Sequence, residues 1–266
     1  MKVLVLSDLH VGSVFGIFPR GFKTKQGNEI KLNEGQCALL YYFDKMIDDI
    51  DKIDCLFLLG DLVQGLNVKE SGRFVMPCDF DIQIDACIFL LKKIVKKFKK
   101  IKILGISGSP YHTSDIFSPE KYIIEELGGK FLNMIATVNL NDYYINISHG
   151  VSAAIIYRTT IMEREMFFSS LSEYSQKIKK IEIFVRGHWH TALSIFYPSL
   201  KKWYIQNACF QGYVPYSKSL LYYGKSQPDI GATIIELPKK KDIFNIKVNF
   251  LLYPLPDFKY FLRGIG

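Results

Sequence analysis

The stretch KVLVLSDLHVG, residues 2–12, opens the chain with an apolar run and then turns polar at Asp8 and His10. A short uninterrupted apolar run of this kind is typical of a strand buried on both faces of a sheet. It meets charged residues too early to be the apolar region of a signal peptide, so we expect a core strand. Asp8 and His10 are two residues apart, which places both side chains on the same side of the chain.

Further apolar runs end in the same way, on an acidic residue or a histidine. They are CLFLLGD (55–61), IKILGIS followed by GSPYHT (101–113), YYINISHG (143–150) and IEIFVRGHWH (181–190). Segments with helical spacing of apolar residues separate these runs, at about 34–50, 81–100, 119–128 and 153–176, and short strands are expected at about 192–197, 202–206, 231–237 and 243–252. This alternation predicts an α/β fold with a largely parallel sheet.

Ligands of such sheets bind at the carboxyl ends of the strands. The residues that the apolar runs deliver to that edge are Asp8, His10, Asp61, His112, His149, His188 and His190. A single one of them would be read as a turn former or a hydrogen-bonded loop residue. The set contains all five histidines of the chain, however, and this concentration indicates one functional site.

Mixed histidine and aspartate ligands suit divalent ions such as Mn, Fe, Zn, Ni or Co. D-x-H and H-x-H spacings each allow two side chains to reach one ion. Six ligands are too many for one ion with an open position, but they suit two ions that share a carboxylate. Two ions about 3.5–4 Å apart can activate water and stabilise the oxygens of an in-line displacement at phosphorus.

The bulk composition sets wider limits. The chain has 266 residues, 48% of them hydrophobic, and no repeat or linker, so we expect a single domain over 1–266. Its five scattered cysteines favour reduced thiols of the cytoplasm. No stretch approaches the roughly 18 apolar residues of a membrane span, so no membrane partner is expected. The net charge of +8 is compatible with nucleic acid as a partner, or reflects only a lysine-rich coding bias.

The order of the motifs resembles that of the calcineurin-like metallophosphoesterase superfamily. They are SDLHVG (7–12), GDLVQG (60–65), GSPYH (108–112), SHG (148–150) and GHWH (187–190). The resemblance implies a four-layer α/β/β/α sandwich of two mixed sheets flanked by helices. It also implies a hydrolase in which a hydroxide that bridges two metal ions attacks a phosphoester, with a phosphodiesterase or nuclease favoured over a phosphomonoesterase. Manganese is the ion that we expect.

The resemblance also implies a role for each matching residue. Asp8, His10 and His190 would bind the first ion, and His149 and His188 the second. Asp61 would bridge the two ions.

The third motif departs from the family pattern G-N-H, because Gly108 and His112 are separated by Ser109, Pro110 and Tyr111. His112 would then polarise the phosphate or protonate the departing oxygen. The missing asparagine ligand could be replaced by water, by Ser109 or by a backbone carbonyl. Alternatively, His112 itself has become a ligand.

Residues beside these motifs are candidates for contact with the substrate. We expect Tyr111 and Arg158 to bind it, the first by its ring and the second by its charge, and Trp189 and Phe15 are further aromatic candidates. The rival hypothesis is a non-catalytic scaffold on the same fold, such as the retromer subunit that resembles this family. The missing asparagine keeps that alternative open.

A further resemblance concerns origin. The G-S-P-Y-H form of the third motif, KLNEGQ (31–36) and QPDIGATIIEL (227–237) are similar to a subgroup encoded by phages and archaeal viruses. We therefore expect the protein in the cytoplasm, that of the host if the gene is viral. A dimer is compatible with this subgroup, although no interface can be read from the sequence.

Overall fold

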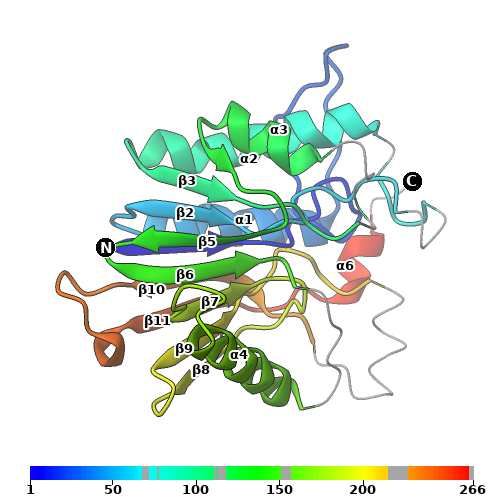
Figure 1. Cartoon of the computed structure of the whole chain (residues 1–266). Coiled ribbons are helices and arrows are strands. Elements are labelled where there is room, and N and C mark those ends of the chain that lie inside the picture. The colour runs from blue at the N-terminus through cyan, green and yellow to red at the C-terminus, as the bar shows by residue number, and fades with distance from the viewer. Residues whose placement is uncertain are drawn as a thin grey trace.

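The computed structural model describes residues 1–67, 72–76, 78–110, 112, 118–150, 157–214 and 227–263 (Figure 1). The helices are α1 (Glu34–Asp49), α2 (Phe80–Lys97), α3 (Pro119–Glu126), α4 (Arg158–Tyr174), α6 (Phe258–Leu262) and the 3-10 helix η3 (Ile243–Asn245). The strands are β1 (Lys2–Leu6), β2 (Cys55–Leu58), β3 (Lys102–Gly105), β4 (Lys130–Phe131), β5 (Ile135–Leu140), β6 (Tyr143–Ser148), β7 (Ile183–Arg186), β8 (Leu193–Tyr197), β9 (Lys202–Gln206), β10 (Ile230–Glu236) and β11 (Lys247–Tyr253). No described helix has the length and apolarity needed to cross a membrane.

The strands form two mixed sheets. The first has the order β11-β10-β1-β2-β3-β4, in which β1 to β4 are parallel and β10 and β11 run antiparallel. The second has the order β5-β6-β7-β9-β8, in which β6, β7 and β9 are parallel and the outer strands β5 and β8 are antiparallel. The expectation of a largely parallel sheet therefore holds only for the central strands.

Alternation along β1 shows how the layers are held together. Leu4 and Leu6 point into one core, which they share with apolar residues of the helices α1, α2, α3 and α6. Val3 and Val5 point the other way, into a second core between the two sheets. Burial of both faces explains why the whole run is apolar.

A third, smaller core joins the outer face of the second sheet to α4. Met162 and Met166 of α4 pack on Phe184 of β7 and Tyr204 of β9. Figure 1 shows α2 and α3 on one side of the two sheets and α4 on the opposite side. The predicted four-layer α/β/β/α sandwich is thus confirmed.

Several elements differ from the sequence prediction. The strands β4 and β5 and the helix α6 were not predicted, and residues 243–245 form a 3-10 turn where a strand was expected. The fourth helix starts at Arg158 among the described residues, and the first part of its predicted range, 153–156, lies outside them. The weak periodicity of IATVNL, 135–140, explains the missed strand, since its pairing with β6 is what makes it one.

Candidate metal centre

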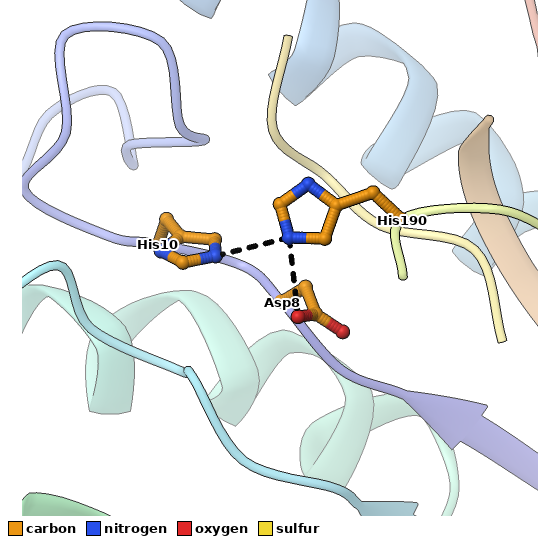
Figure 2. Close-up of side chains that lie close together, drawn as sticks. All are labelled: Asp8, His10 and His190. Atoms are coloured by element: carbon orange, nitrogen blue, oxygen red, sulfur yellow. Dashed lines mark hydrogen bonds and ion pairs between the residues drawn. The ribbon is translucent and has the colours of Figure 1, made fainter. Parts of the chain in front are cut away.

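Asp8, His10 and His190 form a group that we call the first cluster. Asp8 and His10 follow β1, and His190 follows β7, about 180 residues later in the chain. The Nε2 atom of His190 lies 3.2 Å from Oδ1 of Asp8 and 3.3 Å from Nε2 of His10. Figure 2 shows the ring of His190 between the other two side chains. All three offer a ligand atom to one point in space.

Asp61, His149 and His188 form the second cluster. They follow β2, β6 and β7. The Nε2 atom of His149 lies 2.9 Å from Oδ2 of Asp61 and 3.3 Å from Nδ1 of His188. The two clusters adjoin, because the same Nε2 atom is 3.8 Å from Oδ1 of Asp8.

A middle cluster links them. It consists of His10, Asp61 and His112, so it shares one residue with each of the other clusters. The Nε2 atom of His112 is 3.8 Å from Oδ2 of Asp61, and its ring packs edge-on against that of His10. All seven residues predicted at the rim therefore meet there, drawn from both sheets.

The backbone at this rim adopts an uncommon conformation. Asp8, His10, Asp61, His188 and His190 all have positive φ, between 47° and 75°. Left-handed backbone costs a non-glycine residue of order 1–3 kcal/mol, and such residues gather at functional sites. The sharp turns that result aim side chains from four strand ends at a common centre.

Hydrogen bonds fix the orientation of three rings. His10 Nδ1 lies 3.0 Å from the side-chain oxygen of Gln64, and His112 Nδ1 lies 2.7 Å from the backbone oxygen of the same residue. His149 Nδ1 lies 2.6 Å from the backbone oxygen of Leu59. Since a carbonyl oxygen only accepts, each Nδ1 carries the proton and each Nε2 is directed at the carboxylates.

Two close contacts hold Asp61 in place. The backbone N–H of Ser109 donates to Oδ1 at 2.7 Å, and the Ser109 hydroxyl lies 3.1–3.2 Å from both oxygens. A Cβ atom on Gly108 would stand 2.1 Å from Oδ1 of Asp61, so only glycine fits there. Ser109 thus occupies the position of the missing asparagine, but its partner here is the carboxylate.

The carboxyl groups are ionised. Burial by itself raises the pKa of Asp8 and of Asp61, but the positive charges of nearby histidines outweigh it. For both groups the main opposing neighbour is His149, so both pKa values lie below the ordinary range.

The histidines divide into two kinds. Burial and the charge of His112 lower the pKa of His10 to about 3, and burial together with His149 lowers the pKa of His188. Burial also acts to lower the pKa of His149, but Asp61 and Asp8 raise it to about 9. In the same way burial is outweighed at His190, where Cys209 and Asp8 raise the pKa to about 10. Each of the first and second clusters therefore has one histidine that holds a proton at neutral pH.

The donor set fits divalent ions. Two nitrogen ligands at about 2.1 Å from one ion lie roughly 3.0–3.4 Å apart at octahedral or tetrahedral angles. The His10–His190 and His149–His188 nitrogen pairs, both at 3.3 Å, match that spacing. Asp8 and Asp61, both almost fully buried, supply the negative charge that two ions would neutralise.

The predicted substrate-binding residues fare unevenly. Tyr111 lies outside the described residues. Arg158 begins α4 and is close enough to Asp229 for their charges to interact; Asp229 in turn donates its backbone N–H to the carbonyl of His190 at 2.8 Å. Phe15 was a wrong candidate, because it is fully buried in the helix-facing core.

Gln64 and Cys209 were missed in the sequence. Gln64 is quoted within GDLVQG, and the only signal was a buried amide directly after a strand end. Cys209, buried beside His190, was read only as a reduced thiol. Each of the two touches a ring from a distant segment, which no local pattern reveals.

A groove leaves the centre along the outer face of the second sheet. Its volume is about 1320 Å³. Ser109 and His149 line the end at the metal centre, and β5, β6 and α4 line the rest. Trp189, expected to be near the substrate, also lines it.

Neither a family model nor a curated protein sequence matches the chain. Among solved structures, it is similar to an archaeal phosphodiesterase, with 11% identity and a TM-score of 0.48 over 94% of this chain and 99% of that one. It is also similar to the phosphoesterase YfcE from E. coli (13%, 0.45, 89% and 88%). A third is the zinc complex of Vps29 from Entamoeba histolytica (13%, 0.42, 95% and 99%). The viral subgroup stays a prediction.

Proposed function

We propose that the protein is a phosphodiesterase that works with two divalent metal ions. The observation that carries this proposal is the sharing of ligands: His10 belongs to two clusters and Asp61 to two clusters, so the seven side chains form one continuous set. A continuous set with a shared carboxylate is what two adjacent ions need. We take Asp8, His10 and His190 as ligands of one ion, His149 and His188 as ligands of the other, and Asp61 as the shared ligand.

The residues of the chain have distinct tasks in this proposal. When bound, the ions supply a water activated for attack on phosphorus and neutralise charge on the phosphate oxygens. The Leu59 carbonyl and both groups of Gln64 keep Nε2 of His149, His10 and His112 directed at the site. Ser109 holds Asp61 at a fixed distance from His149.

His112 is our candidate for the general acid. Its Nδ1–H donates to a backbone carbonyl, so a second proton would sit on Nε2, which faces the cluster. From there it can pass to the departing alkoxide oxygen as the P–O bond breaks. The alternative, in which His112 binds a metal ion, agrees with its place in the middle cluster.

A diester is favoured over a monoester because of the groove that starts at His149 and Ser109. A monoester needs room for one organic group, whereas a diester needs room for two. The groove supplies space for the second group next to the centre. We propose Mn²⁺ as the native ion, with Fe, Ni, Zn or Co as alternatives.

The test is hydrolysis by metal-free protein of bis-p-nitrophenyl phosphate and p-nitrophenyl phosphate, with Mn²⁺, Ni²⁺, Zn²⁺ and Mg²⁺ added back separately. We expect the diester to react faster, and Asp61→Asn to lose on the order of 10³-fold in kcat/KM. Asp44→Asn is the matched control, since Asp44 pairs with Lys93 on the helical surface and should leave activity unchanged.

The role of His112 is tested separately. His112→Ala should lower kcat about 10²–10⁴-fold while both ions stay bound, which metal analysis would show. Loss of one ion in this variant would identify His112 as a ligand. Metal binding without hydrolysis of either ester would support the scaffold alternative, and faster hydrolysis of the monoester would support a phosphatase.

A further inference from the structure

We infer that the groove between α4 and the β5–β6 pair binds an apolar alcohol group of the phosphodiester, such as an alkyl or aryl chain. This inference rests on the proposed phosphodiesterase function and names its substrate class. It makes the natural substrate an amphiphilic ester, with its phosphate at the metal centre and its apolar part along the second sheet.

The floor of the groove points directly away from the centre. Its outward residues form three cross-strand pairs, listed from the centre outward: Ile135 with Ser148, Thr137 with Asn146 and Asn139 with Tyr144. Ser148 immediately precedes His149, so the first pair adjoins the clusters. Successive pairs are two residues apart, so the floor extends about 13 Å, the length of a chain of about eight to ten carbons.

The charges of the floor are already paired with one another. Asn146 donates to the hydroxyl of Thr137 at 3.0 Å and accepts from the guanidinium of Arg186 at 2.6 Å. Arg186 is almost fully buried and forms an ion pair with Glu165 of α4. A ligand on this floor therefore meets a neutral surface, which disfavours a chain that carries one negative charge per nucleotide.

The walls are apolar. Ile161 and Phe168 of α4 stand on one side, and Met134 and Ile178 stand at the margins. Phe168 and Met134 are more than half exposed, an unusual state for large apolar side chains beside a polar centre. An apolar ligand would remove both from water. The cations Arg164 and Lys179 also line the groove, but both are exposed to solvent.

The experiment uses p-nitrophenyl phosphodiesters whose second alcohol is methyl, butyl or octyl, below the concentration at which they form micelles. In each, water adds to phosphorus, the bond to p-nitrophenolate breaks, and the alkyl phosphate is the second product. We expect kcat/KM to rise at least about tenfold from methyl to octyl. Phe168→Ala should reduce that ratio about threefold or more, because it removes much of one wall.

Phe167→Ala is the matched control. Phe167 is the neighbouring exposed residue of α4 and does not line the groove, so its loss should leave the ratio unchanged. The second readout needs no catalysis: metal-free protein should bind methyl octylphosphonate more weakly in Phe168→Ala than in Phe167→Ala. That binding should change less than about twofold between about 50 and 500 mM NaCl.

The outcomes separate the two proposals. If all the diesters are hydrolysed with no gain from chain length, the groove inference is overturned and the phosphodiesterase stands. If no diester is hydrolysed but the phosphonate binds with the expected loss in Phe168→Ala, the groove inference stands and the proposed function fails. If a single-stranded oligonucleotide displaces the phosphonate with steep salt dependence, the groove binds nucleic acid and our inference is wrong.

Discussion

The first and second clusters contain the same kinds of ligand but are held in different ways. In the first, His10 is oriented by the side chain of Gln64, and His190 lies against the thiol of Cys209. In the second, His149 is oriented by the backbone carbonyl of Leu59. Asp61, the carboxylate of that cluster, is held by a backbone N–H and a hydroxyl.

The difference predicts how each cluster responds to mutation. A side-chain anchor disappears when the residue is replaced, whereas a backbone anchor survives almost any substitution. The first cluster should therefore be the one that can be weakened selectively. Three predictions test this contrast, beginning with the largest expected effect.

Replacement of Gln64 should weaken the first cluster alone. Gln64→Ala removes the acceptor of His10 Nδ1, so we expect metal affinity at one of two sites to fall about 10–100-fold. The site containing His149 should keep its affinity. Calorimetric titration with Mn²⁺ would resolve the two sites. Gln36→Ala is the control, a buried glutamine that caps α1.

Equal weakening of both sites in Gln64→Ala would contradict the contrast. It would mean that the middle cluster couples the two sites so strongly that separate anchors have no meaning.

Proton release should be the same for the two clusters despite their different anchors. The pKa values of His149, about 9, and His190, about 10, lie above the ordinary value, so both rings are protonated in metal-free protein at pH 7. Metal ions bind only the neutral ring, so each ion should displace about one proton, and each affinity should rise about tenfold per pH unit up to pH about 9. His10, with a pKa of about 3, releases none.

The number of protons is measured by calorimetry in buffers of different ionisation enthalpy. Release of about two protons at pH 7, falling toward none above pH about 10, is the expected result. Release at only one of the two steps would show that the clusters differ in charge as well as in anchoring.

The smallest effect is expected for Ser109→Ala. The hydroxyl contacts both oxygens of Asp61, but the backbone N–H, at 2.7 Å, remains after the substitution. We expect a loss of less than about fivefold in kcat/KM. Ser107→Ala, in the same loop and bonded to the carbonyl of Asn133, is the control. A loss of a hundredfold would instead show that Ser109 replaces the asparagine ligand of the third motif.

Much of the candidate site could be predicted from the sequence because its residues follow strands. A buried strand is visible as an apolar run, and the carboxyl ends of parallel strands share an edge. Asp8, Asp61 and His149 each come one to three residues after such a run, so their meeting needed only the correct fold class. Phe15 shows the limit, because its buried position depends on stacking against Phe258, far away in the chain.

By itself, the sequence determined the ligand types, their order along the chain and the strands that present them, since these follow from local composition and spacing. Only the tertiary structure decided how the strands divide between two sheets, because strand pairing uses backbone groups that every residue has. It also decided the left-handed turns at the rim, the anchors from Gln64 and Leu59, and the groove beside β5. Each of these joins segments distant in sequence, and such contacts leave no periodic signal in either segment.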